Sequence, residues 1–246
     1  MLFTRPTAPL SSGEFIALMA FLMSLVALSI DAVMPALPLL GQQLAVTNPN
    51  DVQLVIGIIF FGLATGQIFF GPWSDSIGRK PVIYCGLTIF IIGSIISATA
   101  SDFNIMLLGR LLQGIGASGP RTISVALVRD QFEGRAMARI MSFIMAVFII
   151  VPTIAPALGL SIMMLFDWQA IFYSFFLLAS IVLVWFAGRQ PETLSKASRI
   201  SLSFGHFWNG LKTILTNKQT LAYTLAAGII FGAFIGYLTS AQQIFQ

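Results

Sequence analysis

Residues 71–81 read GPWSDSIGRKP and lie between two long apolar runs. Within this stretch the carboxylate of Asp75 is close in sequence to two cations, Arg79 and Lys80. Its glycines permit a tight turn, and its prolines favour the stopping and restarting of helices. The stretch therefore predicts a short charged hairpin between two helices that are long enough to cross a lipid bilayer.

The overall composition places the chain in a membrane. Of its 246 residues, 57% are hydrophobic and 9% are charged, so a soluble globule of this size has no room to bury its apolar side chains. The cations that give the net charge of +4 fall mostly between apolar runs, and we expect no nucleic-acid partner. The single cysteine, Cys85, lies inside an apolar run, and the single histidine, His206, lies outside them. We therefore expect no metal site and no cofactor.

Seven runs approach or exceed the roughly 20 apolar residues that span a hydrocarbon core. They are residues 15–40, 52–70, 82–100, 103–128, 140–166, 168–187 and 221–244. Between the last two runs, aromatic and aliphatic residues recur at helical spacing beside lysines, which predicts an amphipathic helix on the inner membrane face. Three parts are expected: a six-span bundle over 1–188, a cytoplasmic linker with the amphipathic helix over 189–220, and a seventh span over 221–246.

Lysines and arginines in the loops predict the orientation of the chain. Eleven of the thirteen fall on one side: Arg5, Arg79, Lys80, Arg129, Arg135, Arg139, Arg189, Lys196, Arg199, Lys212 and Lys218. The alternate loops, around 41–51, 101–102 and 167, contain none. Because positive loops stay in the cytoplasm, we expect a multi-pass protein of the cell's inner (plasma) membrane with a cytoplasmic N-terminus.

Three charges fall inside apolar runs, and one of them, Arg121, lies near enough to the cytoplasmic end of the fourth run for its side chain to reach water. Asp31 lies in the outer half of the first run and Arg110 in the fourth, where a charge costs on the order of 2.5 to 3.5 kcal/mol. Each is expected to face a cavity or a partner rather than lipid. Asp31 is either a carboxylate that exchanges a proton or one that stays hydrated or ion-paired. Arg110 either serves the same cycle or only holds helices together, and Gln113, one turn on, is placed to hydrogen-bond a ligand or Asp31.

Small residues and prolines mark special points in the runs. Gly62 and Gly66 form a small-xxx-small pair that predicts close helix packing. Pro152 and Pro156, followed by Gly159, predict a bendable stretch in the fifth run, because each proline removes a backbone donor.

Five segments, in order, resemble motifs of the drug:proton antiporters of the major facilitator superfamily. They are DAVMPALP at 31–38, GPWSDSIGRK at 71–80, RLLQG at 110–114, PTIAPALG at 152–159 and RQPETL at 189–194. The resemblance is strongest to the bicyclomycin/chloramphenicol-type multidrug efflux group. It implies an all-α integral membrane fold, with a superfamily-like six-helix bundle followed by one further transmembrane helix.

The resemblance also implies roles for particular residues. Proton coupling and the substrate cavity are assigned to Asp31, Arg110 and Gln113. A conformational latch on the cytoplasmic side is assigned to Gly71, Asp75, Gly78, Arg79, Lys80 and Asp130. Helix bending is assigned to Pro152, Pro156 and Gly159. The expected activity is proton-coupled efflux of small hydrophobic or cationic drugs by alternating access, with protons, a small-molecule substrate and the lipid bilayer as partners.

Two departures from the family pattern leave alternatives open. The family has twelve spans in two bundles, so this chain is expected to be part of a longer transporter, with the second bundle supplied downstream or by a partner chain. The fifth-run motif has Ala155 before Pro156 and Leu160 after Gly159, where the family usually has glycines. The alternative function is therefore a proton-coupled uptake symporter for a small metabolite on the same fold.

Other function classes fit the sequence poorly. A seven-span retinal protein needs a lysine in its last span, and residues 221–244 contain none. An intramembrane enzyme needs a nucleophile with a base, or a set of metal ligands, inside a span, yet the only histidine lies outside the spans. We therefore expect a transporter and not an enzyme.

Overall fold

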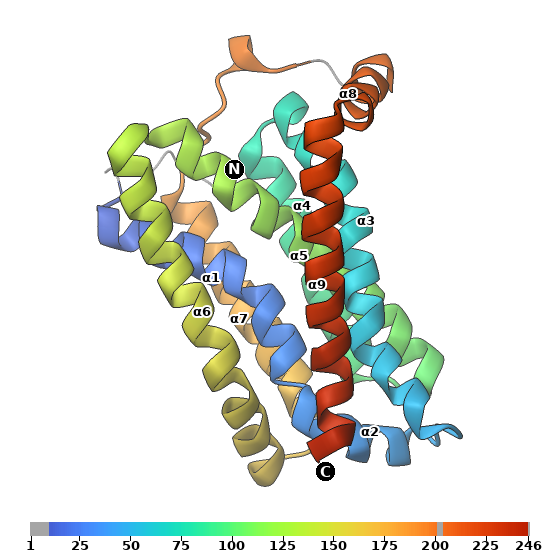
Figure 1. Ribbon diagram of the computed structural model, residues 1–246. Coiled ribbons are helices and arrows are strands. Elements are labelled where there is room, and N and C mark those ends of the chain that lie inside the picture. The colour runs from blue at the N-terminus through green and yellow to red at the C-terminus, as the bar shows by residue number, and fades with distance from the viewer. Residues whose placement is uncertain (1–9, 201–203, 246) are drawn as a thin grey trace. The chain divides into compact units, whose positions relative to one another are not determined.

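The computed structural model describes residues 10–200 and 204–245, and all the regular structure in those ranges is helical (Figure 1). Two compact units, Met1–Arg199 and Ile200–Gln246, make up the chain. The first contains α1 (Ser12–Asp31), η1 (Met34–Ala36), α2 (Leu37–Gln43), η2 (Pro49–Gln53), α3 (Leu54–Ile77), α4 (Arg79–Ala98), α5 (Phe103–Gln131), α6 (Gly134–Leu165), α7 (Gln169–Arg189) and η3 (Lys196–Ser198). The second contains α8 (Phe204–Thr216) and α9 (Lys218–Phe245). Arg5 lies outside the described residues.

Six helical segments in the described residues are long and apolar enough to cross a membrane. They are Ser12–Gln43, Pro49–Ile77, Arg79–Ala98, Gly134–Leu165, Gln169–Arg189 and Lys218–Tyr237. The all-helical membrane class is thereby confirmed. Seven apolar spans were predicted, and six of them correspond to these segments. The fourth predicted span corresponds to α5, which is not among the six. Arg110, Gln113 and Arg121 make α5 more polar than its neighbours.

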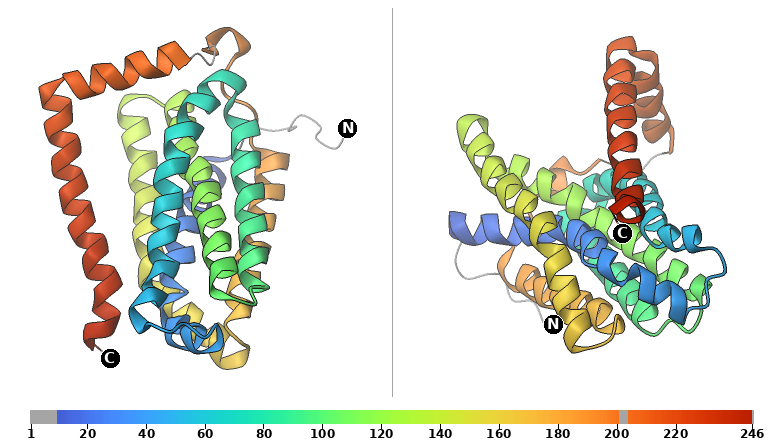
Figure 2. Two further views of the ribbon diagram at one scale, coloured as in Figure 1. Left: turned by 90° about the vertical axis from the view of Figure 1, so that its right-hand side faces the viewer. Right: turned by 60° about the horizontal axis from the view of Figure 1, so that its bottom comes forward.

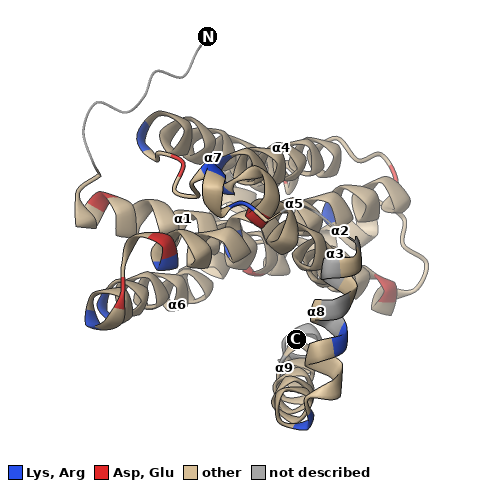
Figure 3. Cartoon of the chain, turned by 90° about the horizontal axis from the view of Figure 1, so that it is seen from above, with Lys and Arg blue, Asp and Glu red and all other residues tan. Residues whose placement is uncertain are grey.

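In the first unit, the long helices run side by side and alternate in direction (Figure 2). One end collects the start of α1, the turn from α3 to α4, the turn from α5 to α6, and the end of α7. Lysines and arginines mark helix ends and turns there (Figure 3). At the opposite end, Trp168 before α7 donates from Nε1 to Gln43 Oε1 of α2 at 2.6 Å. This contact ties the start of α7 to α2 at that end.

The helix α5 packs closely between α3 and α4 because glycines remove side-chain bulk at the crossings. A Cβ atom at Gly62 would meet the Leu111 carbonyl oxygen, and one at Gly114 would meet the Ile59 carbonyl oxygen, so α3 and α5 touch through their backbones. A Cβ at Gly93 of α4 would lie 2.7 Å from the Gly109 carbonyl oxygen of α5. The packing predicted for Gly62 is confirmed, and it extends to α4.

The proline-containing stretch of α6 is part of one continuous helix. Both Pro152 and Pro156 lie inside that helix. Beyond them, Gly159 faces the end of α1, where an added Cβ would collide with the Ala32 carbonyl oxygen. The close contact between α6 and α1, next to Asp31, therefore depends on the absence of a side chain at Gly159.

The hairpin predicted at residues 71–81 is shorter in the structure. α3 continues through Pro72 to Ile77 and α4 begins at Arg79, so Gly78 alone makes the turn. Its φ of 114° lies in a region that L-residues with a side chain rarely adopt. The prediction that Gly71 shapes the turn is wrong, because Gly71 is helical and a Cβ there would meet nothing within 4 Å. Pro72 does not end α3, in line with the tolerance of proline in membrane helices, where neighbouring groups replace its missing hydrogen bond.

Candidate functional site

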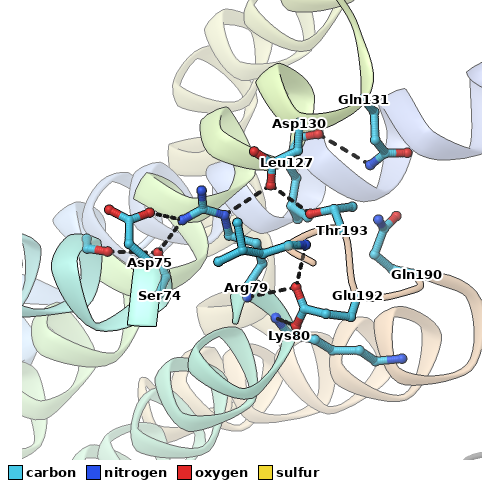
Figure 4. A network of polar contacts seen from close by, with 12 residues as sticks. Ser74, Asp75, Arg79, Lys80, Leu127, Asp130, Gln131, Gln190, Glu192 and Thr193 are labelled. Carbon is cyan, nitrogen blue, oxygen red and sulfur yellow. Dashed lines mark hydrogen bonds and ion pairs between the residues drawn. The ribbon is translucent and has the colours of Figure 1, made fainter. Parts of the chain in front are cut away.

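A polar cluster joins α3, α4 and α5 at the end of the bundle where α4 begins (Figure 4). We call Ser74, Asp75, Arg79 and Asp130 the Arg79 cluster. The Arg79 side chain is 10% exposed, and its Nη1 pairs with Asp75 Oδ1. Nη1 also donates to Ser74 Oγ at 2.8 Å, and Nε donates to Asp130 Oδ2 at 3.1 Å. One guanidinium therefore connects three helices.

Local sequence explains how this cluster is built. Asp75 and Arg79 lie four residues apart across the Gly78 turn, which brings their side chains together at the junction of α3 and α4. Ser74 donates to the Gly71 carbonyl oxygen at 2.8 Å and so turns its oxygen toward Arg79. Asp130 lies in the last turn of α5, and its side chain is 19% exposed. Of the residues assigned to a latch, Asp75, Arg79 and Asp130 meet here and Gly78 makes the turn, whereas Gly71 contributes only its carbonyl group and the Lys80 side chain donates to the Ala187 carbonyl oxygen of α7.

Two further residues enter this cluster that the sequence analysis did not single out. Glu192 accepts from the backbone N–H groups of Arg79 and Lys80, and Thr193 donates from Oγ1 to Asp130 Oδ2 at 2.7 Å. Both belong to the RQPETL segment at 189–194. In the sequence, the only indication of their importance was the resemblance of this segment to a family motif. More than 110 residues separate Glu192 from its partners, so spacing alone did not reveal the contact.

A second polar group lies inside the bundle around Arg110. Its Nε donates to the Val55 carbonyl oxygen and its Nη1 to Gln113 Oε1, both at 2.9 Å. Gln113 Nε2 in turn donates to Ser94 Oγ of α4 at 2.8 Å. The guanidinium carbon lies 5.7 Å from the ring centre of Phe172 on α7. Arg110 and Gln113 are fully buried, and the predicted pairing of their faces is present.

Asp31 stands apart from this group. It ends α1 and is partly exposed, and no hydrogen bond or ion pair within residues 10–200 and 204–245 joins it to Arg110 or Gln113. Gln113 was expected to hydrogen-bond a ligand or Asp31, and in this structure both ends of its amide are engaged by Arg110 and Ser94 instead of Asp31. In the described part of the chain, Arg110 Nη2 is left without a hydrogen-bond partner.

The start of α1 is tied to the end of α7. Arg189 donates from Nε to Glu14 Oε1 and from Nη2 to Glu14 Oε2, each at 2.6 Å. Trp185 adds a third donor to the same carboxylate at 3.2 Å. A two-pronged arginine–carboxylate pair of this kind constrains geometry more strongly than a single contact. The helix that carries Asp31 is thus fixed to α7.

Comparison with known proteins decides the family. Residues 19–246 match the sequence profile of the Major Facilitator Superfamily. This chain belongs to that superfamily. The superfamily consists of transporters rather than enzymes, so the expectation of a non-enzymatic membrane protein is confirmed.

Several relatives of this superfamily chain have been described. It is 31% identical over 237 residues to a bicyclomycin resistance protein homolog of Haemophilus influenzae, covering 96% of this chain and 59% of the relative. It is 30% identical to the uncharacterized MFS-type transporter YdgK of Bacillus subtilis, over 93% of this chain and 58% of the relative. It is also 35% identical to the multidrug resistance protein MdtL of Citrobacter koseri, over 69% and 44%.

A solved structure supports the superfamily fold. The human organic anion transporter MFSD10 (TETRAN) matches with a TM-score of 0.60 at 20% identity, covering 80% of this chain and 53% of that one. This likeness concerns the fold alone. The chain spans between 44% and 59% of the length of the three curated relatives named above.

Proposed function

We propose that this superfamily chain takes part in proton-driven efflux of small hydrophobic or cationic drugs across the inner membrane by alternating access. The observation that carries the proposal is the Arg79 cluster, in which one guanidinium holds the ends of α3, α4 and α5 together. The names of the Haemophilus and Citrobacter relatives, which refer to bicyclomycin and multidrug resistance, support the substrate class.

The Arg79 cluster has the properties of a conformational latch. Ion pairs that exist in one conformer and break in another bias the equilibrium between the two. Arg79 is nearly buried and Asp130 is mostly buried, so this pair is weakened less by solvent than exposed surface pairs are, whereas the Asp75 side chain is 47% exposed. In the proposed cycle the cluster is intact while the cytoplasmic side is closed and breaks when that side opens.

Asp31 and Arg110 are the proposed coupling residues. Asp31 is a partly exposed carboxylate on a helix that is otherwise mostly buried, so it can take up a proton from one side of the membrane. Arg110 is a buried cation with an unused donor. We propose that Asp31 is protonated from outside as drug leaves and releases the proton inward when substrate binds. Arg110 and Gln113 influence that exchange through the helices they join.

The proposal includes the orientation and the parts of the chain. The N-terminus and the Arg79 cluster lie on the cytoplasmic side, as the distribution of loop cations favours. Residues 1–188 form the first bundle and 221–246 a further span. Between them, α8 lies on the inner membrane face, where Trp208 and Ile214 are exposed beside Lys212.

Replacing Asp31 by Asn tests the coupling role. The substitution keeps the shape and removes the titratable proton, so proton-driven transport of a fluorescent cationic dye into everted vesicles should fall about tenfold or more, while dye binding persists. Asp167→Asn is the matched control, because Asp167 is exposed in the turn between α6 and α7. Transport by the Asp31→Asn protein at the native rate contradicts the coupling role.

The same assay tests the function itself and separates it from uptake. The assay compares the 246-residue chain with a longer chain that includes the product of any downstream reading frame. Proton-driven dye accumulation in either preparation supports efflux, and its absence from both overturns the proposal. The competing function is proton-coupled uptake of a small metabolite, which the departures of the α6 motif at Ala155 and Leu160 favour. In that case intact cells accumulate a metabolite together with protons, and no drug is exported.

A further inference from the structure

The segment that follows α7 crosses the turn between α3 and α4. We call residues 190–194 the strap; Figure 4 shows Gln190, Glu192 and Thr193 beside the Arg79 cluster. The first N–H groups of a helix have no partner within the helix, and a side chain at the N-cap normally accepts from them. The N-cap of α4 is Gly78, which has no side chain to do so.

Glu192 takes the place of that missing cap. Its Oε1 accepts from the Arg79 N–H at 3.0 Å and its Oε2 from the Lys80 N–H at 2.9 Å. A carboxylate at a helix N-terminus is also favoured by the helix dipole. The Leu194 N–H donates to Oε1 at 3.0 Å, which fixes the carboxylate in position. Glu192 thereby holds the backbone of the residue whose side chain forms the cluster.

Thr193 contacts the other side of the same cluster. Its hydroxyl donates to Asp130 Oδ2, the oxygen that also accepts from Arg79 Nε. The strap therefore holds both partners of the pair between α4 and α5, Arg79 through its backbone and Asp130 through its side chain. Lys80 adds a third connection, donating from Nζ to the Ala187 carbonyl oxygen at the end of α7.

The strap is anchored at its origin. Arg189, the last residue of α7, is held by both oxygens of Glu14 on α1. Gly78 is enclosed on the strap side, because an added Cβ would lie 2.6 Å from Glu192 Oε2 and 3.0 Å from Arg199 Nη2. Contacts thus run from α1 through the end of α7 and the strap to α4 and α5.

We propose that the strap is a positioning element of the latch: Glu192 and Thr193 hold Arg79 and Asp130 in register, and the cluster cannot open until the strap releases them. This inference rests on the proposed latch. Because the strap continues directly from α7, a movement of the end of α7 relative to α4 and α5 is transmitted to the latch. Glu192 and Thr193 are positioning residues and touch no substrate in this scheme.

Thiol accessibility tests the strap without any transport. Leu127 of α5 is 1% exposed and lies one turn before Asp130, so a Leu127→Cys probe in a Cys85→Ala background reacts with maleimide only when this end opens. In purified protein, Thr193→Val should raise the labelling rate by about tenfold or more, the effect of losing one hydrogen bond to a charged group. Glu192→Gln should raise it similarly, because an amide nitrogen cannot accept from an N–H.

Matched variants distinguish positioning from general stability. Thr193→Ser keeps the hydroxyl and should label at the native rate. In an Asp130→Ala background, Thr193→Val should add no further increase, because its partner is absent. A full additive increase there, or native labelling rates in both Thr193→Val and Glu192→Gln, overturns the strap. Since labelling needs no substrate or proton gradient, a failure of dye efflux in the native protein counts against the proposed function and leaves this test intact.

Discussion

At the scale of single residues, Arg79 forms hydrogen bonds or ion pairs with more partners than any other cation in the described part of the chain. Its side chain reaches Ser74, Asp75 and Asp130, and its backbone N–H reaches Glu192. A hydrogen bond between groups of which one is charged contributes about 1.5 to 3 kcal/mol when it is well formed. Removing the Arg79 side chain therefore takes a donor from Ser74, Asp75 and Asp130 at once, and of these Asp130 keeps the donor Thr193.

The two glycines of the 71–81 stretch differ sharply, which gives a residue-scale prediction. Gly78→Ala should destabilise the protein by about 1 to 3 kcal/mol, because alanine is strained at a φ of 114° and its Cβ meets Glu192. Gly71→Ala should be neutral or stabilising by about 0.5 to 1 kcal/mol, since Gly71 is helical and faces open space. Thermal unfolding in detergent measures both. Equal shifts for the two variants would contradict this assignment of the turn to Gly78.

The contacts of Arg110 show which partners of a residue can be predicted from spacing along the sequence and which cannot. Gln113 lies three positions on, so a shared helix face follows from the sequence, and the structure has the hydrogen bond. The remaining partners, the Val55 carbonyl oxygen and Ser94, come from other helices. Periodicity within α5 carries no information about which neighbours it meets.

At the scale of elements, α5 depends on its neighbours for its place in the membrane. It is too polar to qualify as a span by length and composition, but its small residues allow α3 and α4 to cover it. Its polar side chains Arg110 and Gln113 are consequently buried in protein and not in lipid. The sequence correctly predicted a helix over 103–128. It did not show that neighbouring helices shield this helix from lipid.

A substitution at the crossing of α3 and α5 tests this dependence. Gly114→Val should destabilise the bundle by about 1 to 3 kcal/mol, because the added atoms overlap the Ile59 carbonyl oxygen and lie 3.0 Å from the Leu63 nitrogen. That corresponds to a fall in the unfolding midpoint of roughly 2 to 4 °C per kcal/mol. Gly57→Ala is the matched control, because Gly57 of α3 is exposed and its Cβ would meet nothing within 4 Å. An unchanged midpoint for Gly114→Val contradicts the backbone contact.

At the scale of the whole molecule, the distribution of cations determines the expected orientation. Basic residues mark the end of the first unit that carries the Arg79 cluster, and the loops around 41–51, 101–102 and 167 at the opposite end have none. Positively charged loops are retained in the cytoplasm during insertion. The proposed latch and the proposed cytoplasmic face therefore coincide.

Cysteine labelling in intact cells checks this orientation. In a Cys85→Ala background, Thr47→Cys should react with a membrane-impermeant maleimide added outside, because residue 47 is exposed in a loop without basic residues. Glu133→Cys, exposed between α5 and α6, should react only after the cells are opened. The reverse pattern would place the N-terminus and the Arg79 cluster outside and would contradict the proposed direction of the cycle.

The sequence by itself determined the helical membrane class, the approximate helix ends, the side that carries the cations and the family motifs. These properties depend on local composition and on spacing within one helix, which the chain shows directly. It also placed Asp75 and Arg79 together, because they lie four residues apart. It did not predict that Gly71 would be helical, since the neighbouring proline suggested a break.

Only the tertiary structure decided which distant groups meet. It brought Glu192 to the start of α4, Thr193 to Asp130 and Arg189 to Glu14, and it kept Asp31 apart from Gln113. Such contacts depend on how helices cross and on the direction of each side chain at the crossing, and neither is encoded in the spacing along a single helix. For this reason the residue types of the site were predictable, whereas the strap that holds the Arg79 cluster was not.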